Sequence, residues 1–273
     1  MTMSILAVLD DVEKSQGFIQ AVLAQAEYAG AGVVFQLLTP DPLLLPEYAP
    51  LGAIYVLPAE REAHAAEQLG KLRAVIGAAP VAVELLGLHD DVAWLVGDLR
   101  KARIVTDVAM IGARESWAVP WLHRRVAETL ALGSGTPLII LPPGRTLRHV
   151  GHAVLGWKAG AAAVRALHDL VALATPGARI ELAAVGSGPA TVDEARAQER
   201  AVRYLTQHGF AAEALWLDQG GDPADRLVVH ALDQGADLLA IGAFAHSRVR
   251  ELVLGGVTEA LIKDTHLPVM LSH

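Results

Sequence analysis

The chain has 273 residues and a formal net charge of −8, and 53% of its residues are hydrophobic while 5% are aromatic. This length predicts two compact domains, and the excess of aliphatic residues favours parallel strands buried between helices. The acidic balance argues against a nucleic-acid partner, and the absence of cysteine excludes disulfides, thiolate zinc sites and thiol catalysis. Residues 1–6 lack the basic start of a signal peptide, and no stretch reaches the ~18 apolar residues of a membrane span. We therefore expect a cytoplasmic protein without membrane contact.

Short apolar runs alternate with helical patterns along the first half. Strands are predicted at 5–9, 33–38, 81–88, 109–112 and 138–141, and helices at 13–28, 60–76, 91–102 and 121–132. The segment 40–58 interrupts this order with five prolines and many large apolar side chains. This composition fits a lid or a dimer contact, and packing onto its own domain fits equally well. A linker is expected from Pro142-Pro143-Gly144 through His149.

The second half repeats the same order of elements. Strands are predicted at 153–157, 180–185, 214–217, 238–241 and 269–271, and helices at 162–174, 192–208, 223–234 and 257–263. Asp222 and Pro223 supply an N-cap and a first-turn proline for the third of these helices. The sequence therefore predicts an α/β protein of two repeated Rossmann-like domains, at 1–143 and 149–273. Each is expected to be a five-stranded parallel sheet with helices on both faces.

The two halves also end with similar residues. Asp-Val-Ala-Met-Ile-Gly-Ala at 107–113 matches Asp-Leu-Leu-Ala-Ile-Gly-Ala at 237–243. A closing strand opened by proline follows each, 25 residues after Gly112 and 26 residues after Gly242. A repeat of this length fits a duplicated domain rather than a solenoid unit. We expect one strand order in both halves, and closing strands that pack on each other, because a free sheet edge leaves N–H and C=O groups unpaired.

A phosphate-site pattern follows the fourth strand of the second half. In such a sheet, ligands bind beyond the carboxyl ends of the strands. Gly242 leaves the strand and Gly255-Gly256 enters the next helix, so the backbone can approach a ligand and the helix start directs N–H groups at an anion. A glycine turn without a ligand explains the pattern equally well. The candidate binding residues are Gly242, His246, Ser247, Arg248, Gly255, Gly256, Val257 and Thr258.

The segment from Gly242 to Thr258 resembles the nucleotide loop of the universal stress protein family, which is glycine-x-x-glycine, nine residues, then glycine and serine or threonine. Gly242 and Gly255 keep that spacing, whereas Ala245 and Gly256 replace the second glycine and the hydroxyl residue. Together with the order of elements, the whole chain resembles the tandem two-domain bacterial type of this family. The resemblance implies a Rossmann-like fold, association through the last strand and, in one subgroup, ATP or AMP binding without strong enzymatic activity.

The first half departs further from this pattern. Arg124 and Arg125 stand in place of the glycine pair, so two long side chains are expected where phosphate would lie. The resemblance implies a carboxylate that faces adenine after the first strand, and Asp10 holds that position in the first half while Lys158 holds it in the second. An ammonium group cannot accept a hydrogen bond from an adenine amino group. We therefore expect any nucleotide to bind weakly, and in the second half.

Other residues give weaker signals, and none indicates catalysis or a metal site. The histidines form no helical pair spaced for zinc, so surface or linker positions are favoured over metal ligation. Asp10-Asp11 fits a magnesium ion beside phosphate, but a solvated strand end is favoured. Ser134 and Ser187 precede glycines without a nucleophile-elbow pattern, which indicates turn residues. Trp157 fits a core or rim position better than stacking on a base.

The sequence leaves three classes of function open. The leading hypothesis is a non-enzymatic stress-response protein with a weak or vestigial adenine-nucleotide site, for ATP or AMP, in the second domain. The alternatives are a protein-interaction module with no nucleotide ligand and a weak ATP hydrolase. The expected assembly is a homo-oligomer or an intramolecular pseudo-dimer.

Overall fold

The computed structural model describes residues 3–41, 58–102, 104–218, 220–243, 245–246 and 253–273. The first half contains β1 (Ser4–Leu9), α1 (Gln16–Ala29), β2 (Gly32–Pro40), α2 (Pro58–Ile76), β3 (Val83–Asp90), α3 (Val92–Ala102), β4 (Val108–Gly112), the 3-10 turn η2 (Arg114–Ser116), α4 (Pro120–Gly133) and β5 (Leu138–Leu141). The second half contains β6 (His152–Gly156), α5 (Ala161–Leu173), β7 (Arg179–Gly186), α6 (Val192–Gln207), β8 (Ala211–Asp218), α7 (Pro223–Asp233), β9 (Leu238–Gly242), β10 (Ala245–His246), β11 (Val253–Leu254), α8 (Gly256–Lys263) and β12 (Val269–Ser272). The hypotheses about the 40–58 segment fall almost entirely outside the described residues.

Ten of these strands form one sheet, in the order β3-β2-β1-β4-β5-β12-β9-β6-β7-β8. Numbered along the chain, the five strands of each half lie in the same order, 3-2-1-4-5, and pair in parallel within that half. The expected common strand order is therefore confirmed. The short strands β10 and β11 pair with each other as an antiparallel ribbon between β9 and α8, where the sequence predicted only a loop.

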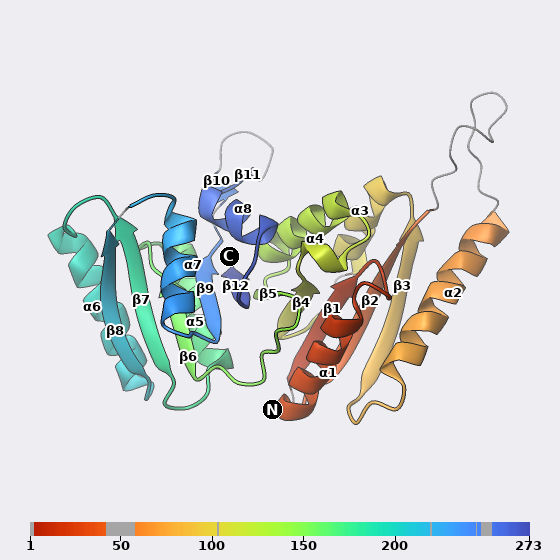
Figure 1. Ribbon diagram of the computed structural model, residues 1–273, viewed down its shortest axis with the longest axis horizontal. Coiled ribbons are helices and arrows are strands. Elements are labelled where there is room, and N and C mark those ends of the chain that lie inside the picture. Colours follow the sequence, from red (N-terminus) through yellow and green to blue (C-terminus); the bar gives the residue numbers. More distant parts are fainter. Residues whose placement is uncertain (1–2, 42–57, 103, 219, 244, 247–252) are drawn as a thin grey trace.

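The two halves meet at their closing strands. Strand β5 pairs antiparallel with β12, so that Leu138 lies opposite Leu271 and Ile140 lies opposite Val269. In Figure 1 this pair lies in the middle of the molecule, and β3 and β8 lie toward opposite ends. The expected contact between the closing strands is confirmed, because each of these two edges satisfies the backbone groups of the other.

The segment between β5 and β6, which joins the two halves, is anchored to the protein by two buried side chains. Leu147 and Val150 are buried, with 4% and 3% of their surfaces exposed. Between the two halves, Arg165 of α5 donates a hydrogen bond to the Gly135 carbonyl oxygen at 3.0 Å. The domain boundaries at 143 and 149 stay a prediction.

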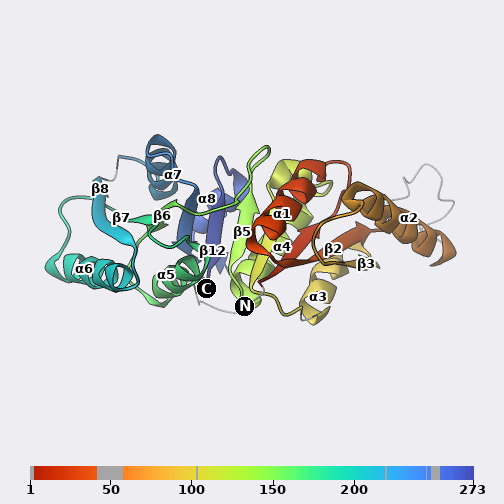
Figure 2. The same cartoon turned by 90° about the horizontal axis from the view of Figure 1, so that it is seen from below.

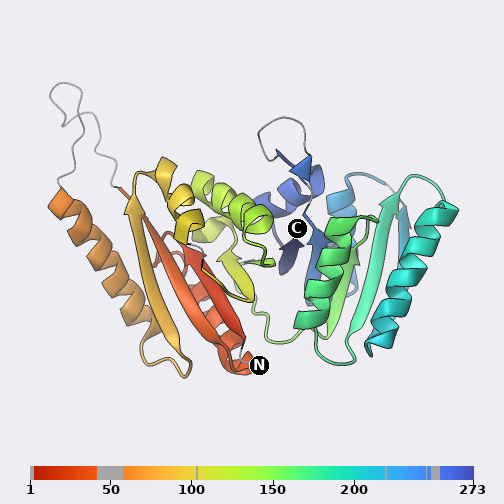
Figure 3. The same ribbon diagram turned by 180° about the vertical axis from the view of Figure 1, so that it is seen from behind.

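Helices cover both faces of the sheet, as Figures 2 and 3 show from below and from behind. One buried apolar cluster lies beneath α1, α2, α5 and α6, and a second lies beneath α3, α4, α7 and α8. Strands buried on both sides explain the aliphatic composition of the chain. Within the described parts of the chain, no helix is long and apolar enough to cross a membrane, and no three histidine or carboxylate side chains gather where they could hold a metal ion.

The starts of α6 and α7 show why these helices begin where they do. The Thr191 side chain accepts a hydrogen bond from the backbone N–H of Glu194, and the Glu194 carboxylate accepts one from the backbone N–H of Thr191. This reciprocal capping box satisfies two N–H groups at the start of α6. At α7, Asp222 accepts a hydrogen bond from Ala224 N at 2.7 Å and Pro223 is the first helical residue, as predicted.

Candidate functional site

A cavity of about 550 Å³ opens in the second half at the carboxyl ends of β6, β7 and β9. Five of the eight residues that the sequence singled out line it: Gly242, Gly255, Gly256, Val257 and Thr258. Of the others, His246 belongs to β10, where only the backbone is described, and Ser247 and Arg248 lie outside the described residues. The structure therefore brings together the two ends of the glycine loop.

Gly242 and Gly256 serve different purposes in this loop. A Cβ on Gly242 would lie 2.5 Å from the carbonyl carbon of Ala162 and 2.7 Å from Ala163 N, so a side chain would meet the backbone of α5. Gly242 is therefore required for the close packing of β9 against α5. A Cβ on Gly256 would meet no atom within 4 Å, so this position borders open space.

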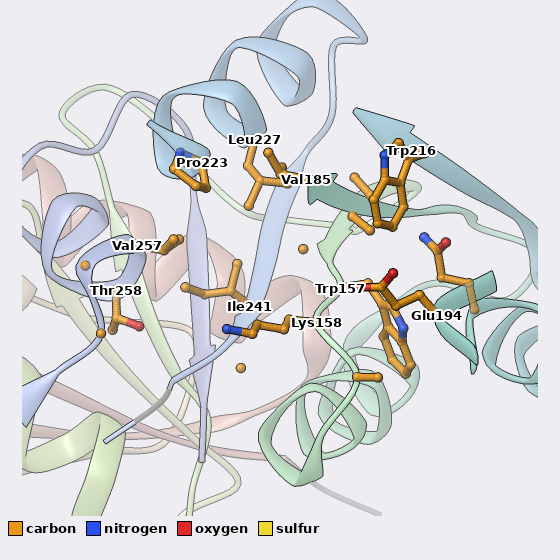
Figure 4. A pocket seen from close by; sticks show the side chains of 18 residues that line it. Trp157, Lys158, Val185, Glu194, Trp216, Pro223, Leu227, Ile241, Val257 and Thr258 are labelled. Atoms are coloured by element: carbon orange, nitrogen blue, oxygen red, sulfur yellow. The ribbon is translucent and has the colours of Figure 1, made fainter. Parts of the chain in front are cut away.

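One end of the cavity presents hydrogen-bond donors. Helix α8 begins at Gly256, and its N-cap residue Gly255 has no side chain to accept from the free N–H groups of the first turn. The Thr258 side chain lies beside this helix start and is 2% exposed. Lys158, which follows β6, also lines the cavity and lies below Ile241 in Figure 4, with its Nζ directed toward the side of Thr258. The helix start and the ammonium group both favour an anion here.

The opposite end of the cavity is aromatic and apolar, and it carries a carboxylate. Trp216 is fixed by a hydrogen bond from its Nε1 to the Gly188 carbonyl oxygen at 2.7 Å, and its ring packs where Gly186 lacks a Cβ. Trp157 is 8% exposed and belongs to the core, while it also lines the cavity. Glu194, in the first turn of α6, lies on the side of these two tryptophans (Figure 4).

Sequence reasoning did not name Trp216 or Glu194 as site residues. Trp216 had a signal, because it lies near the carboxyl end of a parallel strand, which is where ligands bind in such sheets. Glu194 had a signal only as the last residue of the capping box Thr-x-x-Glu, which explains it without a ligand.

Helix α7, whose residues Pro223 and Leu227 also line the cavity, is attached to the sheet by a buried carboxylate. The Glu181 side chain on β7 is fully buried, with Oε2 2.6 Å from His230 Nε2 of α7 and Oε1 2.8 Å from His152 Nε2. Arg179 Nη2 lies 2.8 Å from Oε1. Burial opposes ionisation of Glu181, but the hydrogen bonds of His230 and His152 and the charge of Arg179 outweigh it and hold its pKa below the ordinary value.

The matching place in the first half is filled by the chain itself. The Asp10 carboxylate, after β1, accepts hydrogen bonds from Ala118 N and Val119 N, both at 2.9 Å, directly before α4. Burial raises the pKa of Asp10 to about 6, although these two hydrogen bonds act in the other direction. Trp117 is 2% exposed and donates from Nε1 to the Gly112 carbonyl oxygen at 3.2 Å. The Asp10 carboxylate is thus hydrogen-bonded to the chain's own N–H groups, and the buried Trp117 side chain lies next to them in the sequence.

The expectation that Arg124 and Arg125 lie where phosphate would rest is wrong. Helix α4 begins at Pro120, so both arginines lie in its second turn rather than at its start. Arg124 pairs with Glu128 at 2.9 Å and, across the seam, with Glu259 of α8 at 3.0 Å, and Arg125 pairs with Glu128 at 2.7 Å. Asp10 and Trp117 close the first-half site instead.

Comparison with known proteins relates the second half of the chain to a known family. Residues 146–273 match the model of the universal stress protein family. The second half of the chain is thus similar to the universal stress protein family. A universal stress protein of Synechocystis is 36% identical over 70 residues, which are 26% of this chain and 24% of that protein. A universal stress protein of Methanocaldococcus jannaschii is 35% identical over 51 residues, 19% of this chain and 32% of that protein.

The chain therefore matches only about a quarter to a third of the length of these curated relatives. A structural likeness covers both halves. The crystal structure of a universal stress protein from Archaeoglobus fulgidus superposes with a TM-score of 0.70 at 16% identity, over 99% of this chain and 96% of that chain. At this identity the likeness shows the shared fold alone. The half that matches the universal stress protein model is also the half that holds the 550 Å³ cavity.

Proposed function

We propose that this chain is a non-enzymatic stress-response protein whose second half binds an adenine nucleotide, ATP or AMP, weakly. The observation that carries the proposal is the donor end of the cavity. There, the uncapped start of α8, the Thr258 hydroxyl and the Lys158 ammonium border one space. Backbone N–H groups at a helix start, with a cation beside them, are the donors that phosphate groups use in proteins.

Two departures from the family pattern are the reason for weak binding. Gly256 brings no hydroxyl to the phosphate, and Lys158 brings no carboxylate to the base. Among the described lining residues, Lys158 and Glu194 are the two with charged side chains, and Glu194 lies beside Trp157 in Figure 4, away from Thr258 and the start of α8. A general base for hydrolysis must lie within hydrogen-bond reach of the attacking water. This separation favours binding without hydrolysis over a weak ATP hydrolase.

Calorimetric titration with ATP and AMP tests the proposal. Lys158→Met keeps the length of the side chain without its charge, and Thr258→Val keeps its shape without the hydroxyl. Each is expected to weaken binding about tenfold, because a hydrogen bond to a charged group contributes about 1.5–3 kcal/mol. Lys101→Met is the matched control, since Lys101 lies on α3 and pairs with Asp98 at 2.9 Å. No heat with either nucleotide, or affinities that the two cavity variants leave unchanged, would contradict the proposal.

A protein-interaction role is the second candidate, and exposed tryptophans favour it. Trp94 on α3 and Trp121 on α4 are 67% and 48% exposed, on two helices that pack against each other in the half whose own site is filled. Tryptophan is enriched at protein interfaces. Sedimentation velocity over a range of concentrations tests for self-association. A monomer at every concentration would count against a homo-oligomer.

A further inference from the structure

The two ends of the second-half cavity differ in chemistry, and this difference orients a nucleotide. Thr258 and the start of α8 lie at one end, with the Lys158 Nζ directed toward them, and Glu194 lies at the other end with Trp157 and Trp216 (Figure 4). A phosphate group is attracted to the donor end and repelled by the carboxylate. The base of the same nucleotide then lies against the Trp216 side, where a flat aromatic wall favours a planar ring.

The Glu194 carboxylate has one oxygen engaged and one oxygen to spare. Its Oε2 accepts from Thr191 N at 2.9 Å and from Thr191 Oγ1 at 2.6 Å, and these bonds hold the pKa of Glu194 below its ordinary value. The carboxylate is therefore ionised at neutral pH. Its Oε1 receives no hydrogen bond from another described residue, so it remains an acceptor at the edge of the cavity.

Gln198, one turn further along α6, attaches the helix that carries this carboxylate to the sheet. Its side chain is 5% exposed, and its Nε2 donates to the carbonyl oxygens of Leu182 and Leu215, both at 3.1 Å. These carbonyls lie in the middle of β7 and β8, so Gln198 attaches the first half of α6, which carries Glu194, to the two strands. Glu194 thus projects from a fixed helix start rather than from a loop.

We propose that Glu194 is the base-selecting residue of this cavity, accepting a hydrogen bond from the exocyclic amino group of the base. The proposal rests on the proposed nucleotide binding and adds its selectivity. An acceptor-only carboxylate matches a base that bears an amino group and disfavours a base with an oxo group at the same place. Glu194 on α6 would then supply, from another element, the acceptor that Lys158 cannot provide after β6.

Adenosine and inosine monophosphates provide the test, because they carry the same phosphate and sugar and differ at the amino or oxo group of the base. By calorimetry, the unmodified protein is expected to bind AMP about tenfold more tightly than IMP, the effect of one charge-assisted hydrogen bond. In Glu194→Gln the ratio is expected to fall to about one or below, because an amide whose oxygen stays on Thr191 presents its NH2 group to the base, and this group donates to an oxo group. Glutamine preserves the capping box, so the helix start survives the change.

Thr191→Ala separates recognition from structure. This variant removes the capping hydroxyl and leaves the carboxylate, so the AMP to IMP ratio is expected to stay near that of the unmodified protein. If neither nucleotide binds, the proposed function fails and this inference fails with it. If both bind with a ratio near one, or if Glu194→Gln leaves the ratio unchanged, base selection by Glu194 is overturned while nucleotide binding stands.

Discussion

Two ionisable groups in the first half, the partly buried Asp10 and the buried His123, are expected to have opposite effects on stability between about pH 4 and pH 6.5. Asp10 accepts the N–H groups that precede α4, and His123 lies in α4 with its ring 5.4 Å from the ring centre of Trp117. Single substitutions, Asp10→Asn and His123→Gln, separate the two effects. They also test whether the first-half site is closed as the geometry indicates.

For Asp10, burial raises the pKa from its ordinary value of 3.8 to about 6. The folded protein therefore favours the protonated form, and the stability that this contributes is full below pH 3.8 and is lost as the pH rises through about 6. Each pKa unit corresponds to about 1.4 kcal/mol, so the loss is about 3 kcal/mol. Asparagine does not titrate, so Asp10→Asn is expected to gain about 3 kcal/mol relative to the unmodified protein between pH 3.5 and pH 7.5.

For His123, burial lowers the pKa from 6.5 to about 4. The folded protein favours the neutral ring, so the stability that this contributes is full above pH 6.5 and is lost as the pH falls through about 4. The size is again about 3 kcal/mol. His123→Gln is expected to gain that amount relative to the unmodified protein as the pH falls. In the unmodified protein the two effects nearly cancel over this pH range. Each single variant removes one titrating group, so its free energy of unfolding shows the pH dependence of the remaining group.

Urea unfolding at a series of pH values, followed by tryptophan fluorescence, measures these differences. The double variant provides the control, because its free energy of unfolding lacks both contributions. The reasoning is refuted if the difference between either variant and the unmodified protein stays constant across the window. A constant difference for Asp10→Asn alone would mean that its carboxylate is solvated and that the first-half site is open.

Two further substitutions test the packing that shapes the second-half cavity. Gly242→Ala is expected to lower the free energy of unfolding by about 1–3 kcal/mol, because its Cβ would meet the backbone of α5. Gly256 borders open space, so Gly256→Ala is expected to change the free energy of unfolding little. Equal losses in urea unfolding would argue against this distinction. Glu181→Gln is expected to cost about 3 kcal/mol, because it removes the charge that His230 and Arg179 contact in a buried position; a cost below about 0.5 kcal/mol would show that this cluster does not hold α7.

The fold followed closely from residue patterns. The repeated strand ending in Gly112 and Gly242 and the proline-opened closing strands predicted one strand order and the contact between β5 and β12. These signals worked because strands buried on both faces need continuous apolar runs, and because glycine and proline mark where such strands end and begin. The β10–β11 ribbon gave no such signal, since each strand has only two residues.

The site was predicted only in part, because its two ends depend on different kinds of information. The glycine loop marked the donor end through local sequence. The similar spacing from each strand glycine to its closing proline concealed a difference in how the residues are used: α4 begins eight residues after Gly112, whereas α8 begins fourteen residues after Gly242. The first half has a longer helix and a shorter loop, so pairing Arg124 with Gly255 by position was misleading. Trp216 and Glu194 reach the cavity from separate elements, and no local pattern joins them.

The contrast between the halves explains why one copy of the fold keeps a cavity. At the start of α4, the N–H groups of Ala118 and Val119 already have an anion, the Asp10 carboxylate. At the start of α8, the N-cap residue Gly255 supplies no acceptor, and the residue after β6 that corresponds to Asp10 is the cation Lys158. Free N–H groups at a helix start are stabilised by negative charge from any source. An anionic ligand would therefore accept hydrogen bonds from the start of α8, as the Asp10 carboxylate accepts them directly before α4. Lysine in place of aspartate leaves the position of the carboxylate open, and its positive charge favours an anion from outside the chain.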